Sequence, residues 1–217
     1  HPKSRSFRAR RLLRSMDLPP ARRYDSYMRL FDDSTVDALL PVEDARTSAN
    51  WLSDEFTAMA TDRDCAAAAA AVDRVTYLPD DLLTKVDRAS MLHALEVRSP
   101  FMDPMLVHFA ANLSSDQMFD GKRGKRLQRE AFADDLPAGV FRREKMGFAV
   151  PIGDWIRNDL RGLLRDSLGA RDSFATKYLH RRTIDRLLVE HESAQADHSQ
   201  RLYALLMLEL WQRTFGR

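Results

Sequence analysis

The chain has 217 residues, of which 44% are hydrophobic and 30% charged, and its formal net charge is +2. That length suits one sizeable domain or two small ones, and the composition is ordinary for a soluble globular protein. So small a charge does not by itself indicate a nucleic-acid partner, and a single cysteine excludes an internal disulfide framework.

Helices dominate the expected fold. The chain has only eight glycines and almost no strand-like runs of Val, Ile and Thr. No apolar run reaches the roughly 18 residues that a membrane span needs, and no signal peptide is visible at the start. The composition predicts an all-α fold for the chain as given. The single cysteine fits a reducing cytoplasm, and the lack of a long apolar run predicts no membrane contact.

The first stretch, residues 4–16, has the pattern of a basic amphipathic helix. It carries five arginines between Arg5 and Arg14. A solvated helix face is the simpler interpretation, and a surface for an acidic partner is the other. Since the chain begins at His1 and this stretch already resembles the middle of a protein, we expect a fragment of a longer polypeptide.

Three helices are predicted in the first third of the chain. Proline suits the first turn of a helix, so we expect one to begin at Pro20. Residues 32–34 can cap a short second helix, which Pro41 ends. A third is expected around Trp51 and Phe56.

The alanine-rich run Cys65–Val75 has strong helix propensity and predicts a buried helix. Because Cys65 heads this run, we interpret it as a buried structural thiol rather than a nucleophile. Pro79 should end the helix, and Asp80 or Asp81 can cap the next one.

From Leu82 to Leu95, apolar residues recur at helical spacing and predict one packed face with His93 on it as a core histidine. Asp87 is expected at the edge of that face. Pro100 forces Ser99 out of helical conformation, and Asp103 is interpreted as a helix cap rather than a catalytic acid.

The second half alternates basic loops with amphipathic helices. We expect a polar loop at 113–121, a helix from 121 to 133, a helix from Pro151 to about Leu164 with a stop at Gly169, and a helix from 183 to 191. The last helix, 200–215, is apolar around almost its whole circumference, which predicts burial. Glu209 within it must then be paired, and we expect an arginine partner and a structural role.

Lys125 and Lys145 are the leading candidates for catalysis. A departing phosphate or pyrophosphate carries charge that a lysine can compensate as a mobile point charge with three donors. Lys145 precedes Met146-Gly147, where a missing side chain lets backbone approach a ligand, and Lys125 begins a helix. From the residues alone, two solvated lysines remain the simpler interpretation.

Four further residues are candidates for binding a substrate: Glu96, Arg98, Asp87 and Arg143. For Glu96 and Arg98 the alternative is a structural ion pair. No histidines have metal-ligand spacing, and no nucleophile elbow, Walker A motif or dinucleotide fingerprint is present, so no metal ligands are predicted.

Longer motifs carry a resemblance to a known family. Several segments resemble the synthetase domain of glutamine-hydrolysing asparagine synthetases, and EVRSPFMD and RREKMGF are the most specific motifs in them. The segments are YLPDDLLTKVDRASMLHALEVRSPFMD (77–103), GKRGKRLQREAF (121–132), DLPAGVFRREKMGFAVPIGDWIR (135–157), LPPARRYDSYMRLFDD (18–33) and RLYALLMLELWQRTF (201–215).

The resemblance implies a reaction and roles. ATP and Mg²⁺ would adenylate aspartate, and ammonia released from glutamine by an N-terminal glutaminase domain would displace AMP, giving asparagine, AMP and pyrophosphate. Lys145 would then stabilise charge on the α-phosphate and pyrophosphate, with Lys125 supporting pyrophosphate.

The family's S-G-G-x-D-S pyrophosphate loop, its acidic motif and its glutaminase cysteine are not in this sequence. We therefore expect residues 1–217 to be the helical C-terminal part of an α/β ATP-pyrophosphatase-type synthetase domain, inactive alone, with ATP and Mg²⁺ held mainly by upstream residues. The alternatives are a related amidotransferase or cyclising synthetase with another carboxylate, and a non-catalytic helical module. A homodimer stays open.

Overall fold

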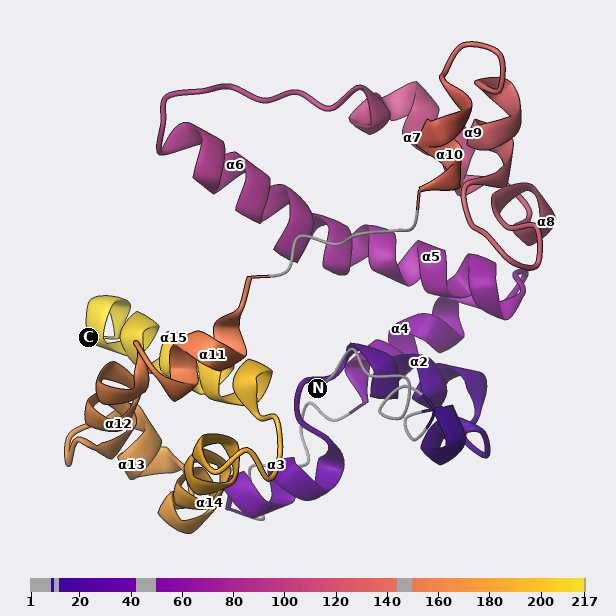
Figure 1. Ribbon diagram of the computed structural model, residues 1–217. Coiled ribbons are helices and arrows are strands. Elements are labelled where there is room, and N and C mark those ends of the chain that lie inside the picture. The colour runs from indigo at the N-terminus through magenta and orange to yellow at the C-terminus, as the bar shows by residue number, and fades with distance from the viewer. Residues whose placement is uncertain (1–8, 10–11, 42–49, 144–149, 217) are drawn as a thin grey trace. The chain divides into compact units, whose positions relative to one another are not determined.

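The computed structural model describes residues 9, 12–41, 50–143 and 150–216. The chain divides into two compact units, each treated by itself below. Unit 1 comprises His1–Pro19, Asp25–Asn50 and Phe148–Arg217, and unit 2 comprises Pro20–Tyr24 and Trp51–Gly147. Within the described ranges the fold is all-α, as predicted, with no strand and one isolated bridge between Phe119 and Gly124 (Figure 1).

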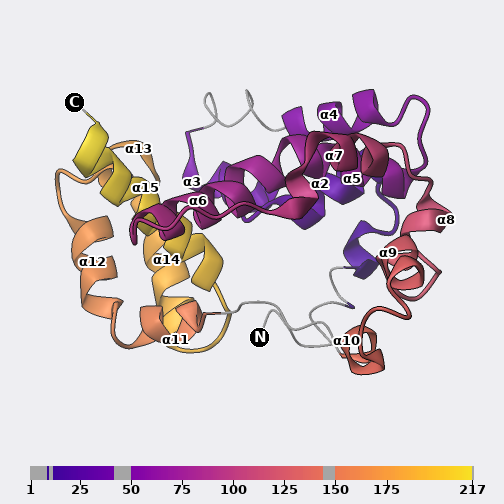
Figure 2. The ribbon, with the colours of Figure 1, turned by 90° about the horizontal axis from the view of Figure 1, so that it is seen from above.

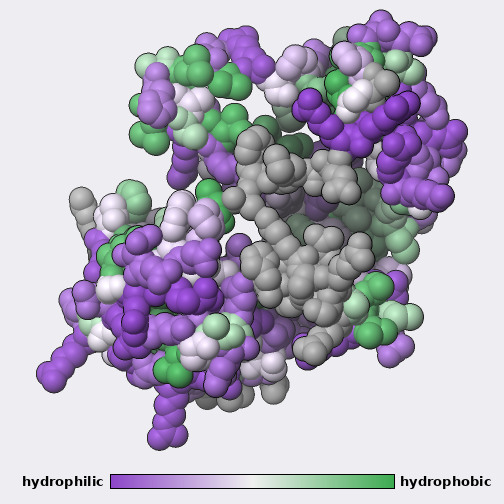
Figure 3. Space-filling model, in the orientation of Figure 1, coloured by the Kyte–Doolittle hydropathy of each residue, from purple (hydrophilic) through white to green (hydrophobic). Residues whose placement is uncertain are grey.

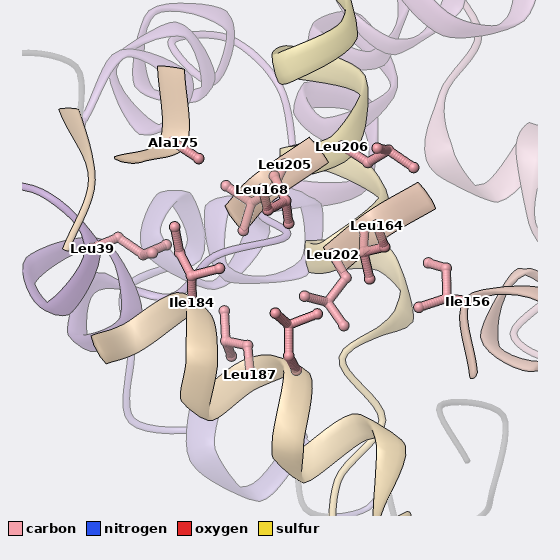
Figure 4. Close-up of a cluster of buried hydrophobic side chains, with 11 residues drawn as sticks. Leu39, Ile156, Leu164, Leu168, Ala175, Ile184, Leu187, Leu202, Leu205 and Leu206 are labelled. Atoms are coloured by element: carbon pink, nitrogen blue, oxygen red, sulfur yellow. The ribbon is translucent and has the colours of Figure 1, made fainter. Parts of the chain in front are cut away.

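Unit 1 is built around a leucine-rich core. Figures 1 and 2 both show its C-terminal helices gathered into one cluster, to which α3 adds Leu39. In the close-up of Figure 4, side chains from α12, α14 and α15 point toward one another. Its helices are α3 (Asp33–Leu39), α11 (Ile152–Arg157), α12 (Arg161–Gly169), α13 (Phe174–Tyr178), α14 (Arg181–Glu192) and α15 (Ser199–Phe215).

Unit 2 has a thinner core and a long open surface. Its first part packs α4 (Trp51–Met59) against α5 (Cys65–Val75), with the Tyr24 and Phe56 rings 5.3 Å apart. From Tyr77 to Arg143 no described side chain is buried. That stretch holds η1 (Leu78–Leu83), α6 (Thr84–Met91), η2 (Pro100–Met102), α7 (Pro104–Ala111), α8 (Ser115–Met118), α9 (Arg126–Ala131) and α10 (Ala138–Arg142).

Local signals predicted several helix ends correctly. Pro20 opens α2 (Pro20–Met28), and Asp32 caps α3 by accepting the Thr35 N–H at 2.8 Å. Asp103 caps α7 through the N–H groups of Met105 and Leu106. These ends need only neighbours within three residues, and that is why the sequence identifies them.

The helix predicted from Leu82 differs from the structure. Neither Asp80 nor Asp81 caps it, because the chain continues through the π-helical turn η1 into α6. Pro79 lies in the first turn of η1, where its missing N–H removes no hydrogen bond from the helix. The expected packing face is also wrong: His93 and Asp87 are exposed, since no described part of unit 2 covers α6.

Two further burial predictions are wrong. Cys65 is exposed, because it opens α5 at the loop end of the α4–α5 hairpin, although Ala68 and Val72 on the same helix are buried. Helix α15 buries Leu202, Leu205, Leu206 and Glu209 but leaves an apolar stripe exposed on its other side. Its neighbours α11, α12, α13 and α14 cover one side only. The stripe consists of Tyr203, Met207, Leu208, Trp211 and Phe215.

Some helices are shorter than predicted. The helix expected from Pro151 is broken between α11 and α12 around Asn158, and it ends at Gly169 as expected. The polar stretch 113–121 contains α8, and α10 and α13 were not predicted at all. Within the helix expected over 4–16, residues 9 and 12–15 are helical, and residues 4–8 and 10–11 lie outside the described residues.

The structure confirms the arginine partner expected for Glu209, which is Arg213. Glu209 is 1% exposed, and its carboxylate accepts hydrogen bonds from Arg213 Nε at 2.9 Å and from the Ala175 N–H at 3.1 Å. Arg213 also donates to the Ser167 carbonyl at 2.9 Å. One buried charge therefore ties α15 to the start of α13 and, through its partner, to α12.

Replacing Glu209 should destabilise unit 1. Glu209→Ala leaves the Ala175 N–H and the Arg213 guanidinium without their shared acceptor, so we expect a loss of about 2–3 kcal/mol in unfolding free energy, measured by urea denaturation. The matched control is Asp185→Ala, which breaks a half-exposed pair with Arg181 and should change stability by about 0.5 kcal/mol or less. Equal effects of the two variants would contradict this role.

A second buried polar group joins α11, α14 and α15. His191 is fully buried; its Nδ1 accepts the His198 N–H at 3.2 Å, so its Nε2 carries the proton and donates to the Gly153 carbonyl at 3.1 Å. Burial lowers the pKa of His191, and the charge of Arg157 adds to this, whereas the Gly153 hydrogen bond and Asp197 oppose it. Both ring nitrogens are therefore used by the neutral form.

Unit 1 should lose stability as the pH falls below about 6.5, because the unfolded chain takes up a proton at His191 that the folded form resists. Denaturant titrations between pH 7 and pH 5 test this. His191→Gln should flatten the dependence, whereas His108→Gln, at an exposed histidine of unit 2, should leave it unchanged. Stability that stays level or rises in the unsubstituted protein over this range would refute the assignment.

Candidate functional site

The predicted site residues that the structure describes all lie on the open stretch of unit 2. Lys125 precedes α9 and is exposed, with a left-handed backbone (φ 60°). That conformation is rare for a side chain other than glycine and costs roughly 1 kcal/mol or more, so the surrounding contacts must impose it. Lys145 lies outside the described residues.

Glu96 and Arg98 pair with each other in the extended segment before Pro100. Arg98 Nε donates to Glu96 Oε1 at 2.6 Å, with side chains 88% and 69% exposed for Arg98 and Glu96. An ion pair this exposed contributes little stability. Breaking it to let Glu96 or Arg98 bind a ligand would therefore cost little free energy.

Asp87 and Arg143 are exposed as well, on α6 and directly after α10. Among the described residues, no hydrogen bond or ion pair joins Lys125 to any of the four predicted substrate-binding residues. The structure therefore brings Glu96 and Arg98 together but does not gather all the candidates into one pocket.

The loop before Lys125 is the best-defined part of this surface, and sequence reasoning missed the residues that shape it. Asp120 Oδ1 accepts the N–H groups of Lys122 at 2.9 Å and Arg123 at 2.7 Å. Arg129, one turn into α9, donates to Asp120 Oδ2 at 2.5 Å. The only sequence signal was the Asp-Gly pair at 120–121, a common turn dipeptide, and Gly121 indeed has a positive φ of 86°.

Electrostatics of the loop follow from these contacts. The Arg123 N–H, the Arg129 side chain and the Lys122 N–H hold the pKa of the Asp120 carboxyl well below its usual range. The carboxylate is thus charged at any physiological pH, yet it faces backbone and Arg129 rather than the lysines. Hydrophilic side chains gather over α8 and α9 in Figure 3.

Other kinds of site find little support in the described residues. No group of three His, Cys, Asp or Glu residues among them is placed to hold a metal ion. None of their helices is both long and apolar enough to cross a membrane. An open depression of about 440 Å³ lies in unit 1 between α12 and α14, but its Arg165 and Arg181 are already paired with Glu192 and Asp185, and no predicted site residue lines it.

Comparisons with known proteins agree on one family. The family model described as asparagine synthase matches residues 2–213. The chain is 30% identical over 140 residues to asparagine synthetase [glutamine-hydrolyzing] 1 of Bacillus subtilis (strain 168), covering 64% of this chain and 22% of that protein. It is 34% identical over 145 residues to a putative asparagine synthetase [glutamine-hydrolyzing] of Mycobacterium tuberculosis (strain H37Rv), covering 66% and 22%.

The chain thus spans about a fifth of the length of the curated relatives it matches. No solved structure matches it.

Proposed function

This chain belongs to the asparagine synthase family. From that premise we propose that it forms part of a glutamine-dependent asparagine synthetase. In the proposed reaction the β-carboxylate of aspartate attacks the α-phosphorus of ATP and pyrophosphate leaves. Ammonia from glutamine then attacks the acyl carbon, and AMP leaves with the carboxylate oxygen. Residues 1–217 would supply the helical part of the synthetase domain, and the pyrophosphate loop and the glutaminase domain would come from residues outside this sequence.

The observation that carries this proposal is the exposure of Lys125 together with its left-handed backbone conformation. The lysine is exposed and held in an unusual backbone conformation beside Lys122 and Arg123, and no described carboxylate forms an ion pair with its ammonium. Three neighbouring positive charges suit a polyanion, and pyrophosphate is the polyanion that this reaction releases. Lys125 would stabilise its charge as the phosphoanhydride bond breaks.

The remaining roles rest on the motifs. Lys145, in RREKMGF, would act on the α-phosphate and pyrophosphate. Glu96, Arg98, Asp87 and Arg143 would contact the substrates, and the first two already lie open to solvent in EVRSPFMD. The described residues offer no carboxylate cluster that fits Mg²⁺, so we assign them no part in holding that metal.

A second candidate is a helical interaction module without catalysis. The observation in its favour is the open apolar surface of unit 2, where Leu92 is 84% and Met105 83% exposed. Such a module has no use for phosphate-binding lysines, so lysine substitutions separate the two candidates. A synthetase or amidotransferase acting on another carboxylate would be recognised by a panel of carboxylate substrates in the same assay.

Aspartate-dependent ATP–pyrophosphate exchange by the complete protein tests the proposal. Lys145→Ala should abolish exchange, and Lys125→Ala should lower it about 10- to 100-fold, as expected for one charge-assisted hydrogen bond. Lys177→Ala, at an exposed lysine of α13, is the matched control and should leave the rate unchanged. If both site variants retain most of the exchange, the lysines have no catalytic role and the interaction module gains support.

A further inference from the structure

A tight reversal of the chain precedes α9. Phe119 and Gly124 form an antiparallel bridge, and the Asp120 N–H donates to the Arg123 carbonyl at 3.2 Å. Asp120 Oδ1 closes the inside of the turn by accepting the Lys122 and Arg123 N–H groups. We call residues 119–125 the 119–125 loop. Its conformation depends on these local hydrogen bonds, because none of its side chains is buried.

Arg129 fastens this loop to α9. Its guanidinium reaches three acceptors of the loop: Asp120 Oδ2 at 2.5 Å, the Gly124 carbonyl at 3.2 Å and the Arg123 carbonyl at 3.3 Å. The Arg129 N–H meanwhile donates to the Lys125 carbonyl at 3.0 Å. The peptide units on both sides of Lys125 are therefore held by one residue.

The base beneath the loop is anchored too. Arg126 donates to the Asp116 carbonyl of α8 at 3.1 Å and pairs with Glu130 at 2.8 Å. Ser115 of α8 donates to Asp64 at 2.6 Å, the residue that caps α5. The loop is thus carried by short helices that hydrogen bonds tie to the packed part of unit 2.

The direction of the Asp120 carboxylate distinguishes this loop from an ordinary polar turn. An acid among Lys122, Arg123 and Lys125 can pair with their side chains, and it would then cancel part of their charge. Here the carboxylate turns inward to N–H groups and to Arg129, and no described acid forms an ion pair with those three cations. The side chains of Lys122, Arg123 and Lys125 are exposed, so an anion can bind them from solvent.

We propose that Asp120 and Arg129 are positioning residues for Lys125. Through the hydrogen bonds described above, they fix the left-handed backbone of Lys125 and so place its ammonium on pyrophosphate. This inference rests on the proposed function, because it assumes that Lys125 binds the pyrophosphate group. It assigns roles to two residues that act on the reaction only through the lysine.

A double-mutant cycle in ATP–pyrophosphate exchange tests it with the complete protein. Arg129→Gln should raise the KM for pyrophosphate about tenfold or more by displacing Lys125, with the KM for aspartate within about twofold. In a Lys125→Ala background the same substitution should have no further effect on the pyrophosphate KM, because the residue it positions is gone. Asp120→Ala should behave in the same way.

Arg181→Gln is the matched control. Arg181 makes a similar i,i+4 ion pair, with Asp185 at 2.8 Å on α14 of unit 1, and among the described residues no hydrogen bond or ion pair joins its side chain to the 119–125 loop. It should leave the pyrophosphate KM unchanged. Amide hydrogen exchange at Lys122 and Arg123 provides a readout without catalysis, and Asp120→Ala should accelerate it because the shared acceptor is lost.

The outcomes separate the two levels of the proposal. If Lys125→Ala leaves the pyrophosphate KM unchanged, the proposed function of Lys125 fails and this inference fails with it. If Lys125→Ala raises that KM but Arg129→Gln raises it further by the same factor in both backgrounds, the function of Lys125 stands and the positioning role is overturned.

Discussion

The absence of buried described side chains between Tyr77 and Arg143 is the constraint on which this protein's candidate site depends. A segment that buries little apolar surface gains little from the hydrophobic effect, so local hydrogen bonds must fix its shape. Asp103 at the start of α7, the Ser114–Gln117 capping box at α8 and Asp120 in the 119–125 loop all do this. Hydrogen bonds of polar residues therefore fix the conformation of the surface that carries Lys125.

Unit 1 follows the opposite strategy. Its leucines form a continuous core, and two of its buried polar residues, Glu209 and His191, have hydrogen-bond partners at both carboxylate oxygens and at both ring nitrogens, respectively. A burial penalty for such groups is offset only when their hydrogen bonds are complete. The packed unit thus resists change, whereas the open stretch of unit 2 is ordered by contacts that single substitutions can remove.

The sequence predicted what depends on near neighbours and failed where distant ones decide. Asp32 and Asp103 were recognised as caps because the N–H groups they accept lie within three residues. The exposed stripe of α15 and the exposed face of α6 were not predicted. Helical periodicity identifies an apolar face, but it does not show whether another helix packs against that face. The motif made Lys125 a candidate, but it gave no sign of the hydrogen bond between Arg129 and Asp120, which lie nine residues apart across a turn.

The central claim, that Lys125 contacts a pyrophosphate group, can be measured by protection of lysines from acetylation. The chain has six lysines, which mass spectrometry can follow separately. Adding pyrophosphate to the complete protein should slow acetylation of Lys125 and Lys145 and leave that of Lys177 unchanged. Acetylation of Lys125 at the same rate with and without pyrophosphate would contradict the account.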